Sequence, residues 1–281
     1  MRIDLHSHSN ASDGKQSPAD VIRSAAEAKL DVVALTDHDT TAGWDEAAVA
    51  AQHHRIALVR GIEISCHHEG ISIHLLGYLQ DPAAPGLIEE LERSRESRET
   101  RAQRIVERLS QDLPLSWDDV LEQTEPGATV GRPHIADAMM AKGIVTSREA
   151  AFAGYLNDRS PYYLSHYAPD PVLAVRLVAQ AGGVAVMAHP FAGARGRVVD
   201  DVVIEAMAAV GMAGLEVHHR DHTAGQVKHG LDLAASLGLF VTGSSDYHGA
   251  GKPNLLGENT TDPVVLQRIE SMATGVGVLR S

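Results

Sequence analysis

Histidine and carboxylate side chains recur beside short apolar runs along this sequence of 281 residues. His6 and His8 are two residues apart in the first run, so on a β-strand their side chains would leave the same face. Glu63 and His74 each interrupt a later apolar run, and His189 directly follows another. Imidazole and carboxylate groups without cysteine suit Mn²⁺, Fe²⁺ or Zn²⁺ better than a site for softer metals. The same pattern holds for Asp37 and His38 after Val32–Leu35, and for Asp246 and His248 after Phe240–Ser245.

Each of these positions is weak evidence by itself, because a lone histidine at a strand end is more often a hydrogen-bonded structural residue than a ligand. The joint pattern is stronger, since six separate predicted strands each deliver an ionisable group at or near the carboxyl end. In a parallel barrel those ends converge on one face. Buried charges without partners are costly, so a cluster of this kind demands compensating cations. The pattern therefore predicts a site for more than one metal ion.

The other histidines fit simpler roles. Two pairs are expected to face water, one at a helix end and one in a turn that ends at Gly70: His53-His54 and His67-His68. Three histidines follow a predicted strand and are expected to form a pocket wall: His218, His219 and His222. His166 and His229 are interpreted as ordinary loop and helix residues.

These side chains need a scaffold of strands, and the sequence alternates β-rich apolar runs with alanine-rich amphipathic segments. The predicted strands are Ile3–His8, Asp31–Thr36, Val59–Ser65, Ser72–Gly77, Gly183–Ala188, Gly214–His218 and Leu239–Gly243. The helical patterns between them include Pro18–Leu30, Asp170–Ala181, Val202–Val210 and Gln226–Leu237. Such alternation implies right-handed crossovers and a parallel sheet. About seven strands within this length favour a closed β/α barrel over an open sheet.

The alternation breaks between Asp81 and about Pro169, where no strong strand signal is found. Turn signals at Asp81-Pro82 and Pro85-Gly86 open this segment, and a charged helical pattern follows over Leu87–Leu109. We therefore expect a barrel made of residues 1–80 and 170–281, with an all-helical insertion at 81–169 that covers the barrel mouth.

Arginines are frequent in the charged helix of the insertion, and most have acidic residues three or four positions away, as on a solvated helix face. Arg101, Arg104 and Arg108 form one stripe with fewer acidic partners, and at least one of them is predicted to hold phosphate. Arg132 and His134 lie where a turn enters a helix, which is a natural anion site.

Bulk composition is that of an ordinary globular chain, with 44% hydrophobic and 22% charged residues. The formal net charge of −13 argues against long-range attraction to long duplex nucleic acid or to anionic membranes. The single cysteine, Cys66, excludes an intrachain disulfide and fits a reducing compartment. With no apolar signal core at the start and no run long enough to span a bilayer, we expect a cytoplasmic protein.

Five motifs together resemble those of the PHP (polymerase and histidinol phosphatase) family, in the expected order and over nearly the whole chain outside the insertion. They are His6-Ser7-His8-Ser9 with Asp13-Gly14, Thr36-Asp37-His38-Asp39, Gly61-Ile62-Glu63-Ile64, Ala188-His189-Pro190, and Gly243-Ser244-Ser245-Asp246-Tyr247-His248-Gly249. The resemblance implies a distorted (β/α)₇ barrel that binds two or three divalent metal ions, with Mn²⁺ favoured over Fe²⁺ or Zn²⁺.

The resemblance also implies roles for particular residues. His6, His8 and Asp246 would bind one metal, with Glu63 bridging to a second that His74 and His189 complete. Asp13, His38 and His248 would hold a third, and catalytic roles fall to Asp246, His189 and Glu63. None of these positions departs from the family pattern, so the site is expected to be intact.

The insertion, with Gly131-Arg132-Pro133-His134 and the arginine-rich helix, is similar to that of family members that are 3′,5′-nucleoside bisphosphate phosphatases. This implies metal-assisted hydrolysis of the 3′-phosphate of a small nucleotide, with Arg101, Arg104, Arg132 and His134 on the second phosphate. The alternatives within the family are 5′–3′ exonuclease action on short oligoribonucleotides and hydrolysis of a small phosphate such as histidinol phosphate. An alternative of a different class is a non-catalytic module stabilised by metal.

Overall fold

The computed structural model describes residues 1–193 and 196–280 and shows a mixed α/β fold with one seven-stranded sheet. The strands are β1 (Ile3–Asp4), β2 (Val32–Leu35), β3 (Ala57–His68), β4 (Ile71–Tyr78), β5 (Val184–Met187), β6 (Gly214–His218) and β7 (Phe240–Gly243). Each of the seven predicted strands is present. The apolar, β-branched character of the runs, bounded by turns, was sufficient to find them.

The sheet keeps the order of the sequence, from β1 to β7, and curls into a barrel. An isolated bridge between Ser7 and Tyr247 joins the segments that follow β1 and β7, which brings the two edges of the sheet together. The predicted distorted (β/α)₇ barrel is therefore confirmed.

One strand departs from the predicted parallel arrangement. β4 pairs antiparallel with both β3 and β5, whereas the other neighbours are parallel. β3 and β4 form a hairpin through Glu69 and Gly70, which both have positive φ (48° and 75°), as a two-residue hairpin turn requires. His67 and His68 consequently belong to β3 rather than to a turn, which corrects the prediction for that pair.

Helices surround the barrel, and several begin as the sequence indicates. α1 (Pro18–Glu27), α7 (Pro171–Gln180) and α10 (Pro263–Met272) each start with proline after a Ser or Asp cap. The others are α2 (Trp44–His54), α3 (Pro85–Leu109), α4 (Trp117–Leu121), α5 (Arg132–Ala141), α6 (Arg148–Ala151), the π-helix η1 (Phe152–Leu156), α8 (Asp201–Ala209), α9 (Ala224–Leu237) and the 3₁₀ turn η3 (Gly249–Gly251). Among the described residues, no helix is both long and apolar enough to cross a lipid bilayer.

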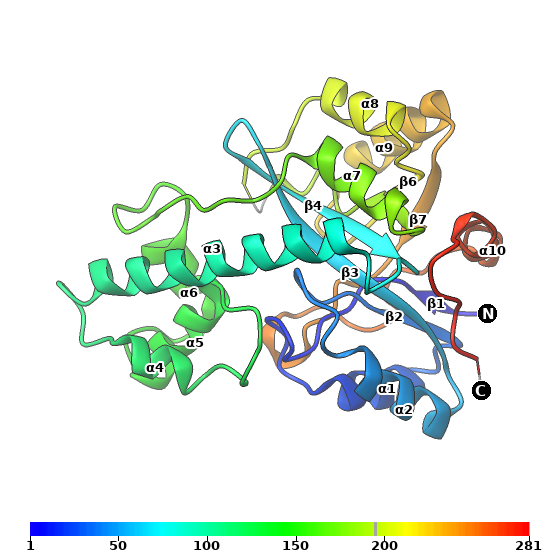
Figure 1. The fold of residues 1–281 in the computed structure, drawn as a ribbon. Coiled ribbons are helices and arrows are strands. Elements are labelled where there is room, and N and C mark those ends of the chain that lie inside the picture. Colours follow the sequence, from blue (N-terminus) through cyan, green and yellow to red (C-terminus); the bar gives the residue numbers. More distant parts are fainter. Residues whose placement is uncertain (194–195, 281) are drawn as a thin grey trace.

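The segment between β4 and α7 is helical throughout its regular structure, as predicted. Figure 1 shows α3 lying along the barrel and α4, α5 and α6 gathered at its far end, on the side of the molecule away from both termini. These helices share a hydrophobic cluster of their own, in which Ile105, Leu109, Ile135 and Met139 are buried. The boundaries of the insertion stay a prediction.

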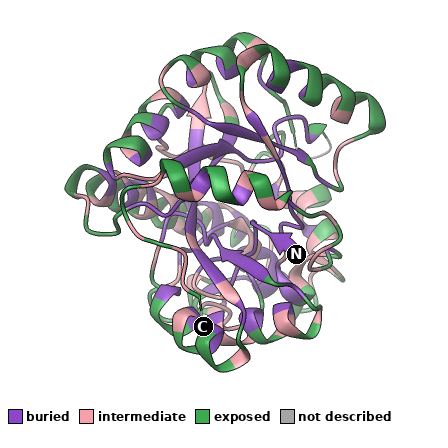
Figure 2. Ribbon diagram, turned by 90° about the vertical axis from the view of Figure 1, so that its right-hand side faces the viewer, coloured by how far each residue is buried: buried purple, intermediate pink, exposed green. Residues whose placement is uncertain are grey.

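The core of the barrel lies inside the curled sheet and between the sheet and its helices. Inside, Leu5, Val59, Leu76 and Val186 are buried against one another. Figure 2 shows this arrangement as largely buried strands surrounded by helices with an exposed outer side. A strand end in such a framework has little freedom, so polar side chains placed there are held in fixed positions.

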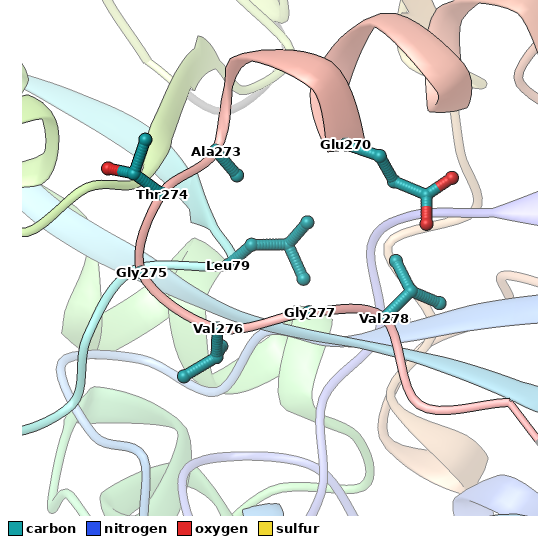
Figure 3. Close-up of a pocket in the computed structure, with 8 residues that line it drawn as sticks. All are labelled: Leu79, Glu270, Ala273, Thr274, Gly275, Val276, Gly277 and Val278. Atoms are coloured by element: carbon teal, nitrogen blue, oxygen red, sulfur yellow. The ribbon is translucent and has the colours of Figure 1, made fainter.

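The C-terminal segment covers the end of the barrel where β4 finishes. Residues Ala273 to Val278 pass Leu79, and with Glu270 they line a small cavity of about 210 Å³ (Figure 3). Because β4 runs opposite to its neighbours, this end is the one from which the parallel strands start. The carboxyl ends of those strands lie at the other end of the barrel.

Candidate metal centre

The side chains predicted to bind metal gather at the carboxyl ends of the parallel strands. Among the described residues, their ligand atoms form four overlapping groups, and the atoms of each group lie within 4.8 Å of one another. The groups are His6, His8, Glu63 and Asp246; His8, Asp13, His38 and His248; His38, Glu63 and His74; and His6, His189 and Glu216. All nine predicted ligands therefore belong to one continuous cluster.

Glu63 lies at the centre of this cluster and presents its two oxygens to different histidines. Oε2 is 3.3 Å from His6 Nε2, 3.1 Å from His8 Nε2 and 3.2 Å from His38 Nδ1. Oε1 is 2.8 Å from His74 Nδ1 and 3.2 Å from His189 Nε2. A carboxylate with ligand atoms on both sides has the geometry of a bridge between two cations.

Asp13 lies on the other side of His8, in a tight loop after β1. Its Oδ1 is 3.1 Å from His248 Nε2 and 3.8 Å from His8 Nδ1, and its Oδ2 is 4.0 Å from His38 Nε2. The next residue must be glycine, because a Cβ on Gly14 would collide with the backbone of His8 and Ser9. The Asp13-Gly14 pair thus folds the loop back onto the first strand.

His74 lies in the cluster because of the direction of β4, which differs from the direction that the sequence predicted. It is in the first half of β4 and pairs with Ser65, near the end of β3. Since β4 is antiparallel, the beginning of this strand lies at the same end of the barrel as the carboxyl ends of the others. The prediction that His74 belongs with the other side chains is met, but the reason given for it, a parallel strand end, was wrong.

Some buried polar atoms of the described residues have no hydrogen-bond partner, and their positions show whether these side chains suit bound cations. Five such atoms belong to the predicted ligands: His8 Nδ1, Asp13 Oδ1, His38 Nδ1, His74 Nδ1 and His248 Nε2. Each of the four nitrogens lies near a carboxylate oxygen, and Asp13 Oδ1 lies near histidine nitrogens, but the geometry is not that of a hydrogen bond. An unsatisfied buried polar atom costs roughly 1–3 kcal/mol, and a cation between such atoms would remove that cost. The donor set therefore fits divalent metal ions.

The pKa shifts of Glu63 and His248 also fit a site for cations. Burial raises the pKa of a carboxyl group, yet His74, His38 and His6 together hold the pKa of Glu63 well below its usual range. Burial lowers the pKa of His248 to about 4, with Lys252 and His8 adding to the effect. Glu63 thus stays charged and His248 neutral, which is the protonation state that ligands need, whereas hydrogen bonds to Asp246 and Glu63 raise the pKa of His8 to about 9 despite its burial.

Two of the residues in the cluster have a backbone conformation that L side chains rarely adopt. His189 has φ of +29° and Asp246 has φ of +54°, and Asp39 beside the site has +53°. Such conformations cost of order 1–3 kcal/mol each and persist where the surrounding structure enforces them. Strained residues of this kind inside a cluster of ionisable side chains are typical of a functional site.

Glu216 is a member of the cluster that the sequence interpretation missed. It is on β6, fully buried, and its Oε1 is 3.0 Å from His6 Nδ1 while Oε2 accepts a hydrogen bond from the His189 backbone N–H at 2.9 Å. With Nδ1–H donating to Glu216, a neutral His6 would present an unprotonated Nε2 to the centre. The signal was available, because Glu216 interrupts the apolar run Gly214–Val217 as Glu63 interrupts its own.

Of the residues predicted to bind the second phosphate, Arg101 and Arg132 lie beside the same aromatic ring. The guanidinium groups of Arg101 and Arg132 both lie over the Tyr163 ring, at 5.4 Å and 5.6 Å from its centre. Burial and the neighbouring charge of Arg132 lower the pKa of Arg101 to about 9. His134 is buried in α5, where its Nδ1 accepts the Gly131 backbone N–H at 3.1 Å, and it lies close enough to Asp13 for the two charges to interact.

Arg104 is exposed, whereas Arg101 is buried, so the two arginines that were predicted to form one stripe have different surroundings. α3 turns Arg98 and Arg101 inward instead. Arg98 Nη1 donates to Asp39 Oδ2 at 2.8 Å and to Ser65 Oγ, and Arg101 Nη1 approaches Nδ1 of the half-buried His166 at 3.1 Å. His166 is therefore not the ordinary loop residue that was expected. We call the group formed by Arg98, Arg101, Arg132 and His166 the arginine cluster.

Comparison with known proteins agrees with this geometry. A family model described as "PHP domain" matches residues 4–123. A 3′,5′-nucleoside bisphosphate phosphatase from Chromobacterium violaceum is 34% identical over 251 residues, covering 89% of this chain and 88% of the relative. A 5′–3′ exoribonuclease from Haemophilus influenzae is 33% identical over 88% of this chain and 90% of its own length. The crystal structure of a metal-dependent phosphoesterase from Bifidobacterium adolescentis superposes with a TM-score of 0.95 at 42% identity, covering 97% of this chain and 96% of that one.

The fold, the cluster and these relatives define a metal-dependent phosphoesterase. The chain belongs to the PHP family, and it is a hydrolase that acts on phosphoesters. The predictions of family, fold class and enzyme class are confirmed.

Proposed function

We propose that this enzyme removes the 3′-phosphate of nucleoside 3′,5′-bisphosphates, such as adenosine 3′,5′-bisphosphate, to give the 5′-monophosphate and phosphate. The observation that carries the proposal is the arginine cluster, a buried group of cations next to a phosphoesterase centre. The bisphosphate phosphatase from C. violaceum, similar over most of both chains, supports the same substrate class.

The reacting phosphate would be held at the metal centre. In our assignment His6, His8 and Asp246 would hold one cation, Glu63 would be shared with a second that His74 and His189 would hold, and Asp13, His38 and His248 would hold a third. Bound divalent cations, with Mn²⁺ as our preferred metal, would act as Lewis acids on the phosphoryl group and supply a nucleophile at neutral pH. Around them, buried Glu216 and the backbone of the strand ends keep the imidazole rings in fixed orientations.

The second phosphate would be held by the arginine cluster. Arg101 is buried, yet its Nε and Nη2 atoms have no hydrogen-bond partner among the described residues, and the same is true of Arg98 Nε and His166 Nε2. His166 Nδ1 faces the Arg101 guanidinium, which can only donate, so Nε2 of a neutral His166 carries a proton and is a donor too. Four buried donor atoms without an acceptor form a site for an anion, and a phosphate offers several acceptor oxygens at once.

The position of the cluster relative to the metal centre fits a substrate with two phosphates. Arg98 contacts Ser65 and Asp39, and the Asp39 backbone N–H donates to the carbonyl of Glu63 at 3.0 Å. The positive charge of Arg98 also contributes to lowering the pKa of His38. The two sites are therefore neighbours, and one small molecule could contact both.

A substrate panel tests the proposal. With Mn²⁺ present, kcat/KM for adenosine 3′,5′-bisphosphate should exceed that for adenosine 3′-monophosphate by roughly ten- to a hundredfold, since the second phosphate adds a charge-assisted contact of about 1.5–3 kcal/mol. The 3′-monophosphate has the same scissile bond and lacks only the distant group. Equal values for the two, or a preference for histidinol phosphate, would show that the substrate is a different one.

Variants of α3 locate the second phosphate. Arg101→Gln should lower kcat/KM for the bisphosphate by about ten- to a hundredfold and leave the 3′-monophosphate nearly unchanged. Arg104→Gln is a matched control, because Arg104 is on the same helix but exposed. A similar loss for both substrates in Arg101→Gln would place this arginine at the reacting phosphate or in a structural role.

A second candidate is 5′–3′ exonuclease action on short oligoribonucleotides. A cavity of about 780 Å³ lies between α5, α6 and the loop after η3, with Gln123, Met140 and Pro253 in its wall. Its size would accommodate a further nucleotide beyond the reacting phosphate. Release of mononucleotides from 5′-phosphorylated di- and trinucleotides, at a higher kcat/KM than for the bisphosphate, would favour this function over the first.

A further inference from the structure

Lys252 touches a predicted metal ligand but is absent from the ligand pattern. Its Nζ is 3.0 Å from Asp246 Oδ2, and its side chain is 30% exposed where it lines the 780 Å³ cavity. Asn254 ties the same loop to the site, because its Nδ2 donates to the carbonyl oxygens of Ser245 at 2.6 Å and of Asp246 at 3.2 Å. The ammonium group of Lys252 is thus held against Asp246 by the loop that carries it.

The two oxygens of Asp246 face different surroundings. Oδ1 is 3.4 Å from His6 Nε2 and 3.3 Å from His8 Nε2, within the predicted metal group. Oδ2 faces Lys252 and, at 3.8 Å, Nε2 of His219. One oxygen is therefore directed at the metal group and the other at side chains that can donate hydrogen bonds.

His219 is a donor rather than a ligand, because of a backbone contact. Its Nδ1 accepts the Asp221 backbone N–H at 3.1 Å, so the proton of a neutral ring is on Nε2. The ring is buried, and Nε2 has no hydrogen-bond partner within residues 1–193 and 196–280. His6 and His248 are arranged the other way, with Nδ1 on Glu216 and on the Asp246 carbonyl, which leaves Nε2 for a metal. Local contacts therefore separate His219 from the ligand histidines.

We propose that Lys252, assisted by His219, is a positioning residue that keeps Asp246 a one-oxygen ligand. This inference rests on the metal role proposed above for Asp246. With Oδ2 paired to Lys252, the carboxylate cannot turn to chelate a cation through both oxygens. One coordination position on that cation then stays available for a phosphoryl oxygen, at the expense of some affinity for the metal, because the ammonium charge repels a cation.

Cobalt substitution tests this directly, since the visible absorption of protein-bound Co²⁺ weakens as its coordination number rises. Lys252→Met removes the charge and the donor while keeping the length of the side chain. In this variant Asp246 should chelate, so the absorption per bound Co²⁺ should lose intensity and the Kd for Co²⁺ should fall to roughly a tenth. With 4-nitrophenyl phosphate and Mn²⁺, kcat should fall by about ten- to a hundredfold. Lys252→Arg should restore the wild-type spectrum.

Lys15→Met is the matched control. Lys15 lines the same cavity, is 33% exposed and pairs with Asp137 rather than with a predicted ligand, so its spectrum and Co²⁺ affinity should stay those of the wild type. A Lys252→Met protein with the wild-type spectrum, or with weaker Co²⁺ binding, overturns the inference and leaves the metal assignment intact. A wild-type protein that binds no Co²⁺ overturns the metal assignment itself.

Discussion

Replacing Glu216 by glutamine changes one atom of a buried side chain and should change which nitrogen of His6 carries a proton. The carboxylate now accepts two hydrogen bonds, one from His6 Nδ1–H and one from the His189 backbone N–H. An amide has one oxygen and one NH₂ group, so it can accept only one of them. The backbone N–H cannot change its role, and the glutamine oxygen should therefore turn to His189.

The NH₂ group would then face His6 Nδ1, which must become an acceptor. The proton of a neutral His6 moves to Nε2, the nitrogen that lies 3.3 Å from Glu63 Oε2 and 3.4 Å from Asp246 Oδ1. A protonated Nε2 cannot bind a metal. Glu216→Gln should consequently fold normally and lose metal affinity.

The size of the effect follows from the loss of an outer-shell partner. Such losses typically weaken metal binding by about ten- to a hundredfold, which corresponds to roughly 1.4–2.8 kcal/mol. The stability of the metal-free protein should change less, because both hydrogen bonds can re-form after the tautomer changes. Glu216→Ala would add a cavity and leave the His189 N–H unsatisfied, at about 1–3 kcal/mol for that donor alone.

Calorimetric titration of the apo protein with Mn²⁺ measures the affinity, and urea unfolding without metal measures the stability. Asp4→Asn is a suitable control, because Asp4 is as buried as Glu216 but accepts backbone N–H groups, from Ser245 and Gly257 among others, rather than an imidazole N–H. It should lose stability while the folded protein keeps its Mn²⁺ affinity. If Glu216→Gln binds Mn²⁺ as tightly as the wild type, the tautomer argument is wrong.

Three further outcomes are expected. Glu63→Ala should lower the metal content by elemental analysis more than His248→Ala does, because a bridge serves two ions; equal and mild losses would contradict the bridge. Gly214→Ala should lower the free energy of unfolding by about 1–3 kcal/mol, since its Cβ would collide with the Phe240 ring, whereas Gly277→Ala, with open space around it, should not. Removing metal with a chelator should abolish phosphoester hydrolysis, and Mn²⁺ should restore it; full activity without metal would refute the assigned centre.

The strands and most members of the histidine and carboxylate cluster could be predicted from the sequence because both depend on local signals. An apolar β-branched run marks a strand, and an ionisable residue inside or just after it is conspicuous. Glu63 and His189 were found in this way. Glu216 carries the same signal but was not predicted.

The direction of β4 was harder, because it depends on a turn rather than on a run. Asn-Gly or Asp-Gly between two strands is a strong hairpin signal, whereas Glu69-Gly70 is a weak one. The residue pattern placed His74 with the other side chains on the assumption of a parallel strand. The antiparallel direction of β4 brings the beginning of that strand to the same end of the barrel.

The arginine cluster shows where helix periodicity is insufficient. Spacing alone relates Arg101 to both Arg98 and Arg104, and it cannot say which of the two shares the inward face. Packing decides this, because Ile105 and Leu109 are buried in the helical cluster and fix the rotation of α3. His166 belongs to an irregular segment, and only tertiary contact brings it to Arg101.

Asp39 connects the two halves of the proposed substrate site. It accepts the Ser65 backbone N–H at 2.8 Å and the Arg98 guanidinium at 2.8 Å, and its own N–H donates to the carbonyl of Glu63. Its left-handed backbone, next to His38 in sequence, makes these contacts possible at once. Glu63, the proposed bridge, and Arg98 of the arginine cluster are therefore set at a fixed separation by one loop residue. If both proposed sites bind phosphate, such a rigid pair would select substrates by the distance between two phosphates, since a molecule that fits one site but not the other gains only part of the binding energy.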